Sequence, residues 1–557
     1  IMSALDSFVA ENYIFDSSID KSVPDSNNYV VKQRNITPII DQQRGNGNYT
    51  SSRVIVDAQS FGNGSDYIDW KNAYITLPYV ITLSATAGAT STLTGSYDQN
   101  MLTALKNHCL IENLRVEQAG RTIVQESNNL SHLVNFIKHC NTTQDDLNSQ
   151  TTQNAYYPDG VFNQSCAASL QGIANVNNFG LSASYLSSVN EGLIKRQQAL
   201  YPANGFANSA FSAVANQTNE FASYQSVTSA VSTINTTATT LSDIHFLAVI
   251  YLKDLSDYFA KHPISKGIGY KFTFVVNQAT STASRTATTT PFNSTPTIAA
   301  TSLTGSSTCQ PAMLCLGAGT LAGNSSVTAT STTYSFSLSS SIDTTTNARQ
   351  QGVIMYVPSY VLAEEYESKL LNNPVIQRTP FMINSAVYTS QTSNAPINLQ
   401  LFNAISNPRT LVVIPQFATG TQTQASNASP LNPSPGVTDN QLSLTKIQVR
   451  VNSKALLPNP SNYSYQQFID NTSRIFKLNG GEGAITSGII DLQKFQNNYR
   501  YYAFDLTSTI SPDQRDVPQL ITFEAYNNSA VNVDLYVYVL YEQSATFDVL
   551  KGSVDIM

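Results

Sequence analysis

The chain has 557 residues, of which 41% are hydrophobic and only 12% are charged. This length exceeds one ordinary domain, so we expect two domains or one domain with large insertions. The formal net charge is −7 and the first fifty residues hold no run of basic residues, which excludes an arginine-rich arm that would neutralise a nucleic acid. Ser, Thr, Asn and Gln must supply the solubility, and such a neutral surface lets copies of one chain lie close together.

The sequence lacks secretion and membrane signals. Its start, Ile1-Met2-Ser3, does not have the charged and then apolar layout of a signal peptide. The apolar run around 246–252 is far shorter than the roughly 20 residues that span a bilayer. An odd number of irregularly spaced cysteines argues against a disulfide framework and indicates a reducing compartment; they are Cys109, Cys140, Cys166, Cys309 and Cys315. We therefore expect a soluble protein made without secretion.

Strand signals dominate the chain. Runs rich in β-branched and aromatic residues, many alternating with polar ones, predict strands. In chain order these runs are 53–59, 73–83, 110–116, 246–252, 270–276, 353–357, 386–389, 410–417, 442–451, 499–506, 520–525 and 531–541. Helical periodicity is scarce, and is best at 130–140, 254–261 and 360–371. Many strands joined by turn-rich loops predict the all-β sandwich class.

Two changes in composition divide the chain. Residues 279–350 are rich in Thr, Ser and Ala, with Arg285, Asp343 and Arg349 as their charges. A disordered linker is one interpretation. Apolar anchors at 309–315 and 334–338 favour instead a long ordered loop that projects from a sandwich. The second change, at 360–380, combines a short helical stretch with two X-Pro steps and indicates a linker between two domains.

The two halves of the chain also share a short pattern. Residues 111–121 and 444–454 each form an alternating strand that ends in a small-residue turn and a cation. Each leads into a segment with an aromatic-Ile pair, Phe136-Ile137 in the first half and Phe468-Ile469 in the second. The pattern suggests two copies of one β-sandwich in tandem.

Several segments, in order, resemble double jelly-roll major capsid proteins of the adenovirus-like lineage, particularly those of virophages and polinton-like viruses. In the first half they are KNAYITLP at 71–78, LIENLRVEQAGR at 110–121, a helix with Asn135-Phe136, and NEGLIKR at 190–196. In the second half they are ISNPRTLVVIP at 405–415, SPLNPSP at 429–435, FQNNYRYY at 495–502 and the last alternating strand. Order and spacing carry the resemblance, which extends over most of the chain from about residue 53.

The resemblance implies an all-β fold of two tandem eight-stranded antiparallel jelly rolls, with long loop insertions and a few short helices. The expected division is an N-terminal arm (1–50), a first jelly roll containing the Thr/Ser-rich loop 279–350 (51–358), a linker (359–380) and a second jelly roll with a C-terminal tail (381–557). It also implies homotrimers whose six jelly rolls form a pseudo-hexagonal capsomer of an icosahedral DNA virus shell. The expected partners are then other copies, neighbouring capsomers, and penton and minor or cement proteins. The expected location is the virion, assembled inside the host cell.

Motifs for catalysis or cofactor binding are missing from the sequence. It has no Gly-x-Ser-x-Gly, His-Glu-x-x-His or phosphate-binding loop motif. The segment 62–67 starts like a dinucleotide fingerprint but lacks its last glycine, so a surface turn is the better interpretation, as it is for 317–319. The adjacent acids Glu364-Glu365 and Asp145-Asp146 point apart on most backbones and do not make the facing pair of a glycosidase.

Three further groups of residues have a possible chemical role and a structural one. His108-Cys109 and His139-Cys140 hold zinc-ligand types but not zinc-ligand spacing, so buried thiols beside ordinary histidines are the better interpretation. Cys309 and Cys315 could pair in a loop, which a reducing compartment disfavours. The cluster Tyr499, Tyr501 and Tyr502 suits core and inter-subunit packing, because nucleic-acid stacking would require more cations than Arg500.

The sequence therefore predicts a non-enzymatic structural protein without catalytic, cofactor or metal sites. It would assemble with its own copies as a major capsid protein, without sequence-specific nucleic-acid binding. The main alternative is a secreted or surface β-sandwich adhesin whose Ser/Thr-rich loop binds glycans. A polysaccharide-degrading enzyme is a third hypothesis, and would require a cleft with converging acids.

Overall fold

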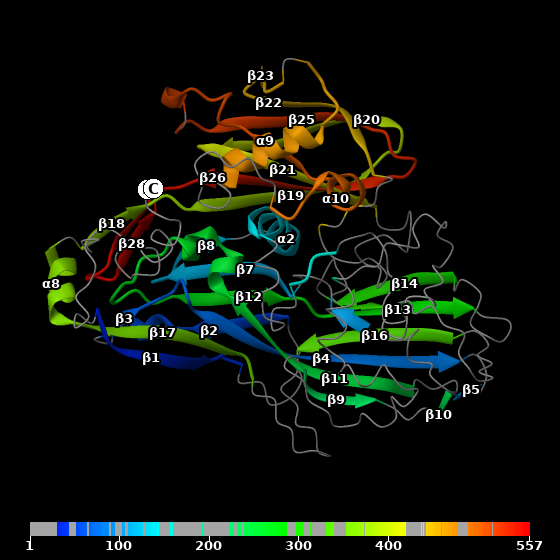
Figure 1. Cartoon of the computed structure of the whole chain (residues 1–557), viewed down its shortest axis with the longest axis horizontal. Helices are drawn as coiled ribbons and strands as arrows, with labels where there is room; N and C mark the ends of the chain where they lie inside the picture. The colour runs from blue at the N-terminus through cyan, green and yellow to red at the C-terminus, as the bar shows by residue number, and fades with distance from the viewer. Residues whose placement is uncertain are drawn as a thin grey trace.

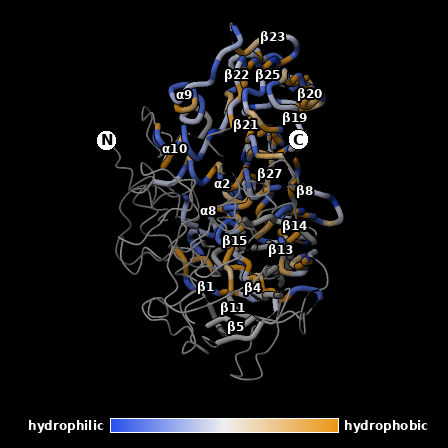
Figure 2. The backbone as a smooth tube through the Cα atoms, turned by 90° about the vertical axis from the view of Figure 1, so that its right-hand side faces the viewer, coloured by the Kyte–Doolittle hydropathy of each residue, from blue (hydrophilic) through white to orange (hydrophobic). Residues whose placement is uncertain are grey.

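The computed structural model describes residues 30–43, 49, 52–63, 66–87, 91–94, 103–105, 110–125, 129–143, 156–159, 192, 222–227, 231–234, 239–286, 297–305, 312–314, 330–338, 352–372, 374–418, 436, 438, 442–457, 459–476, 488–514 and 516–556. Figure 1 shows two β-sandwiches stacked one on the other, the N-terminal one in blue and green and the C-terminal one in yellow to red. In Figure 2 hydrophobic residues follow the strands of both.

The first sandwich has two facing antiparallel sheets. Four strands are neighbours in one sheet in the order β1 (Val31–Ile40), β17 (Ile354–Leu362), β4 (Tyr74–Ala87) and β11 (Thr239–Tyr251). The other sheet has the order β2 (Arg53–Asp57), β12 (Lys271–Val276), β7 (Ile111–Gln118) and β8 (Arg121–Gln125). Numbered one to eight along the chain, these strands give a 1-8-3-6 sheet against a 2-7-4-5 sheet, which is the jelly-roll topology.

The second sandwich repeats this topology strand for strand. Its 1-8-3-6 sheet is β19 (Phe381–Gln391), β26 (Val533–Glu542), β21 (Pro408–Phe417) and β24 (Tyr502–Asp505). Its 2-7-4-5 sheet is β20 (Ala395–Ile405), β25 (Gln519–Asn527), β22 (Leu444–Val451) and β23 (Lys454–Ala455). The chain is therefore a double jelly roll, as the sequence predicts.

The pattern shared by the two halves marks the same hairpin in both jelly rolls. The fourth strands begin at Ile111 and Leu444 and the fifth strands at Arg121 and Lys454, with equal spacing. Both turns have two consecutive residues with positive φ, as in a type I′ hairpin turn. These residues are Ala119 (47°), Gly120 (81°), Asn452 (47°) and Ser453 (68°). A helix of 12 residues follows each hairpin, α2 (Leu130–Asn141) and α9 (Tyr465–Phe476).

Strands from the Thr/Ser-rich segment extend the first 1-8-3-6 sheet. They are β13 (Ala279–Thr286), β14 (Thr297–Gly305) and β16 (Thr330–Leu338), and β16 pairs along β4 beyond the point where β17 leaves it. Short pairs join β15 (Ala312–Leu314) to β6 (Thr103–Leu105) and β10 (Val231–Ile234) to β5 (Ser91–Thr94). In the same large sheet, β9 (Ala222–Val227) pairs with β11 and β3 (Tyr67–Ile68) with β17.

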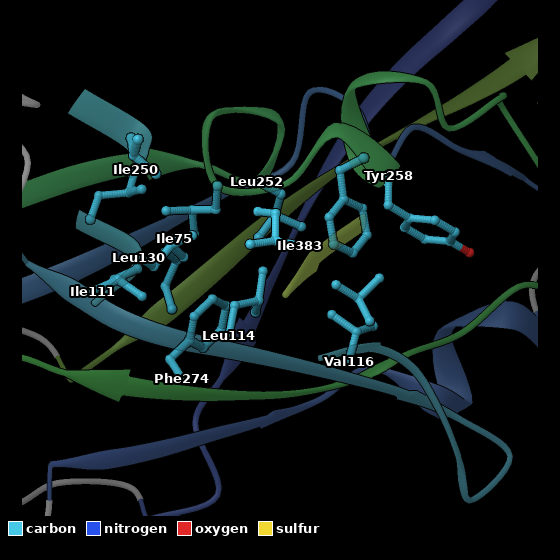
Figure 3. Packing of buried hydrophobic residues seen from close by; sticks show 14 of the residues in the cluster. Ile75, Ile111, Leu114, Val116, Leu130, Ile250, Leu252, Tyr258, Phe274 and Ile383 are labelled. Carbon is cyan, nitrogen blue, oxygen red and sulfur yellow. The ribbon is translucent and has the colours of Figure 1, made fainter. Parts of the chain in front are cut away.

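The core of the first jelly roll continues into the second. Figure 3 shows Leu114, Val116 and Phe274 in the cluster that also contains Ile75, with Ile383 of the second jelly roll among them. The interior of the second jelly roll forms a separate cluster, which includes Leu411, Val413, Phe523, Leu535 and Val537. The two jelly rolls consequently share an apolar interface, and the second also has an interior of its own.

A small sheet ties the C-terminal segment to the first jelly roll. It joins β18 (Val375–Arg378), which follows helix α8 (Glu364–Asn372), to β27 (Ala545–Asp548) and β28 (Ser553–Ile556). The backbone N–H of Lys266 donates to Val549 O at 2.7 Å, and Gln118 Nε2 donates to Gly552 O at 2.9 Å. Gly552 has φ of +70° and lies against the backbone of Gly267, so this contact requires a glycine.

Some elements differ from the expectation. Residues 31–40 lie in the segment expected to be an arm, and they form β1, paired along β17. The expected linker overlaps the end of β17 and contains α8 and β18. The other expected domain boundaries stay a prediction. The helix expected at 254–261 is two short ones, α6 (Leu252–Leu255) and α7 (Asp257–Ala260), because Ser256 is extended and its side chain accepts the Tyr258 N–H as the cap of α7.

Candidate assembly interface

Helix α2 lies between the two jelly rolls, beneath the 1-8-3-6 sheet of the second (Figure 1). It follows the hairpin of β7 and β8 and begins after Asn129, whose backbone is left-handed at φ 66°. Leu130, Leu133 and Phe136 are at most 1% exposed, and His132 is also buried. A helix that is buried on most sides needs apolar residues around its circumference, which this segment has.

The second jelly roll covers α2 with tyrosines of β26. The imidazole of His132 stacks on Tyr536 with ring centroids 4.3 Å apart, and its Nδ1 accepts the Gly436 N–H at 3.0 Å. Tyr538 Oη donates to Asn129 O at 2.7 Å. Tyr536 and Tyr538 alternate with side chains that face the interior, so β26 is buried on both faces. Alternate side chains of 531–541 therefore pack on two different apolar regions, the interior of the second jelly roll and the interface with the first.

The tyrosine cluster at 499–502 belongs to these same packed regions. Tyr501 meets Phe136 edge to face at 5.0 Å, and Tyr499 Oη donates to Asp159 O at 2.6 Å. Tyr502 faces the interior of the second jelly roll, where its Oη accepts the Leu444 N–H at 3.0 Å and burial raises its pKa to about 12. The expected role in core packing is confirmed, whereas the inter-subunit role stays a prediction.

Arg500 also has a structural role. Its Nη1 donates to Leu442 O at 2.9 Å and its Nη2 to Gln496 O at 3.0 Å. The guanidinium therefore holds two backbone carbonyls of the second jelly roll together.

The His139-Cys140 pair lies at the end of α2, inside the interface. His139 Nδ1 contacts Asn135 O, and the ring lies 4.5 Å from that of Tyr499. Cys140 is a buried free thiol, and burial raises its pKa well above the usual value. Within the described ranges no three His, Cys, Asp or Glu side chains gather as metal ligands. His108, Cys109, Cys166, Cys309 and Cys315 lie outside the described residues.

The adjacent acids Glu364 and Glu365 lie at the start of α8. Glu364 pairs with Lys32 of β1 at 3.4 Å, whereas Glu365 pairs with Lys369 one turn along α8 at 3.9 Å. Each acid has a different lysine partner, which is the arrangement of a solvated helix start. Gly62 lies in the 3₁₀ turn Gln59–Asn63, and 145–146 and 317–319 lie outside the described residues.

The outer face of the first 1-8-3-6 sheet carries rows of apolar side chains that no described helix covers. Antiparallel pairing places Pro38, Tyr356, Tyr74 and Tyr251 in one row across the four strands. The Tyr74 ring stacks on Tyr356 at 5.1 Å and contacts Tyr251 at 5.4 Å. We call this the tyrosine face and include in it the exposed isoleucines on either side of Pro38, which are Ile36 (47% exposed) and Ile40 (58% exposed).

The tyrosine face is equivalent in strand order to the outer face of the second jelly roll, whose centre is buried. There, pairing places Val387, Tyr536 and Ile414 in one row across the first, eighth and third strands. Tyr536 stacks on His132 of α2 and Ile414 belongs to the apolar cluster that the two jelly rolls share, and both are at most 6% exposed. Val387, on the edge strand β19, is 39% exposed. The three tyrosines in the first jelly roll are partly exposed. No motif in the sequence indicated this face; the available signal was the tyrosine content of 73–83 and 353–357.

Comparison with solved structures supports the fold. A chain of the cryo-EM structure of the Sputnik virophage matches with a TM-score of 0.53 and 14% identity, over 97% of this chain and 91% of that one. The mavirus major capsid protein matches with a TM-score of 0.46 and 11% identity, over 98% and 94% of the two chains. The Faustovirus major capsid protein matches with a TM-score of 0.43 and 10% identity, over 95% and 93%. The likeness to the Sputnik chain agrees with the double jelly roll that the strand order defines.

Comparisons at the level of sequence find no match, either to a protein-family model or to a curated protein. In the part of the chain that the structure describes, no helix combines the length and the apolar character needed to cross a lipid bilayer.

Proposed function

We propose that the chain is a major capsid protein, a structural subunit without catalytic activity that builds the icosahedral shell of a DNA virus. The observation that carries the proposal is the repeat of one strand order in two stacked jelly rolls, together with a likeness to a virophage chain over 97% of the length. Closing each domain into two facing sheets leaves few strand edges open, which suits a protein that must contact its copies through side chains.

The assembly unit we propose is a homotrimer with six jelly rolls in a pseudo-hexagonal ring. Because each chain has two similar domains, three copies can place six similar contacts around one axis. Each contact is heterologous, which means that it joins two different surfaces, and the ring is closed. Such capsomers would tile the shell in the virion, alongside penton and minor or cement proteins. A low charge content of 12% supports close packing of many copies. The proposed domain division follows the two sandwiches, with β1 in the first.

Light scattering after size exclusion tests the proposal. We expect the purified chain to give a stable species of three times its 60.5 kDa mass, or larger closed particles that electron microscopy shows to be icosahedral. A species that stays monomeric at high concentration would contradict the proposal and favour the adhesin hypothesis, which a glycan-binding screen would then test.

A further inference from the structure

The two jelly rolls differ in how their equivalent outer faces are covered. Within the chain, the first jelly roll buries the centre of the outer face of β19-β26-β21-β24, whereas Val387 on its edge strand β19 stays 39% exposed. The tyrosine face, on the equivalent strands β1-β17-β4-β11, has no such cover among the described residues. Partly exposed rows of tyrosine and isoleucine are typical of the centre of a protein interface. The segments that cover the outer face of the second jelly roll therefore indicate what kind of segment would cover the tyrosine face.

Two connections of the first jelly roll make the cover inside the chain. The connection between its fifth and sixth strands supplies α2, whose His132 stacks on Tyr536. The connection between its sixth and seventh strands supplies α7, which contacts the edge strand β19. There Asp257 Oδ2 accepts the Phe381 N–H at 2.8 Å, and Lys261 Nζ lies 4.5 Å from the centre of the Phe381 ring.

The second jelly roll has the same two connections, which we call the covering segments. Between its fifth and sixth strands lie α9 and α10 (Leu492–Asn497), and between its sixth and seventh strands lie residues 506–518. Each carries an exposed large hydrophobic side chain, Leu492 at 50% and Val517 at 52%. About half of each side chain is exposed, and this half is available to a partner.

Exposed apolar side chains are concentrated on these two surfaces. In the described residues, eight large hydrophobic side chains are exposed. Ile36, Ile40 and Leu247 lie on the outer side of the first 1-8-3-6 sheet, and Leu492 and Val517 lie on the covering segments. Of the remaining three, Leu371 and Val375 lie on α8 and β18, and Val387 lies on the outer side of the edge strand β19. Two separate apolar surfaces on one chain match a heterologous contact, in which each copy offers a different surface to each neighbour.

We propose that the tyrosine face binds a second copy of this chain, and that the covering segments of that copy lie over it as α2 and α7 lie over the second jelly roll. The inference rests on the proposed function and specifies its interface. Tyr74, Tyr251 and Tyr356 form the apolar floor of the contact, and Ile36 and Ile40 its edge along β1. Leu492 and Val517 enter from the other copy.

Two double variants test the proposed contact between copies. Each variant places glutamates on one of the two surfaces and leaves the other surface intact. One carries Ile36→Glu and Ile40→Glu on the tyrosine face, and the other carries Leu492→Glu and Val517→Glu on the covering segments. All four positions are at least 47% exposed, so the fold should tolerate the charges, and equal melting temperatures would verify this. The matched control is Leu371→Glu, at 54% exposure on α8 and outside both surfaces.

We expect each double variant to need at least about tenfold higher concentration than the wild type to assemble, with the control unchanged. Mixing the two variants should produce a dimer of one copy of each, because each retains the surface that the other lacks. If either double variant assembles like the wild type, or if the mixture stays monomeric, the pairing is wrong. A wild-type chain that is itself monomeric would instead contradict the proposed function.

Discussion

His132 of the first jelly roll and Tyr536 of the second form a stacked pair, with ring centroids 4.3 Å apart and both side chains buried. The pair joins the helix after one hairpin to the eighth strand of the next domain, and the acceptor role of His132 Nδ1 toward the Gly436 N–H fixes the ring. Its burial indicates that the two domains form one continuous apolar interface, so single changes in this contact should alter the stability of the whole chain.

Removing the Tyr538 hydroxyl should weaken this interface. Tyr538→Phe leaves the Asn129 carbonyl without the 2.7 Å bond in a buried position, at an expected cost of about 1 kcal/mol. Denaturant unfolding should show a lower midpoint. Tyr526→Phe is the control, since its hydroxyl donates to Asn394 O at 2.8 Å in an exposed setting where water can replace it. Equal shifts for the two variants would show that the interface bond contributes nothing specific.

The C-terminal contact should depend on a glycine. Gly552→Ala would drive a Cβ into Gly267 O on a backbone with φ of +70°, which combines a clash with a conformational cost. Gly120→Ala is a matched control, because its φ is +81° but open space surrounds it. We expect the control to lose about 1 kcal/mol of stability. The Gly552 variant should lose more and expose the C-terminal segment to protease, and a smaller loss than in the control would contradict the contact.

Most jelly-roll strands could be predicted because their side chains alternate or form apolar runs. Each of the twelve predicted runs overlaps one of these strands, from β2 to β26. Four strands were missed, three of them for a physical reason. β23 has only two residues, and β8 has only two apolar residues among its five. β1 contains Pro38, which an edge strand tolerates because it needs only one row of hydrogen bonds. In β20 the signal was present, since Ile397, Leu399 and Leu401 alternate with polar residues.

The candidate interface was harder to predict than the fold. Tyr74 and Tyr356 are distant in sequence, and only their pairing across β4 and β17 brings them into one row. Helix α9 was missed because polar residues outnumber its apolar ones, and tertiary contacts such as Phe468 stacked on Phe495 at 5.0 Å stabilise it. The repeat of the hairpin at Ile111 and Leu444 was the sequence signal that related the two halves correctly.

Cys140 should be chemically inert in the native protein. Its thiol is buried in α2 and burial raises its pKa, so little thiolate forms and reagents have no access. Alkylation followed by peptide mapping should find Cys140 unmodified in the native state and fully modified after denaturation. Rapid native labelling at this position would mean that the interface opens readily.

Acid should destabilise the contact between the first jelly roll and the C-terminal sheet through His262. The imidazole is buried, with Nδ1 2.6 Å from Pro263 O and Nε2 2.7 Å from Tyr270 Oη, whose oxygen also contacts Tyr258 Oη at 2.7 Å. The centre of the Phe547 ring of β27 lies 4.7 Å from that of the imidazole. Burial lowers the pKa of His262 from 6.5 to about 3.

Below pH 6.5 the imidazole of His262 binds a proton in the unfolded chain, but in the folded state it stays neutral until the pH approaches about 3. The contribution of His262 to stability is complete above that pH and is lost as the pH falls toward 3, by at most about 1.4 kcal/mol per pH unit. His262→Gln removes the titrating group, so melting temperatures measured between pH 7 and pH 4 should fall less steeply for the variant. Parallel curves for the two proteins would mean that other groups cause the acid sensitivity, because Tyr258 and Tyr270 stay neutral throughout this range.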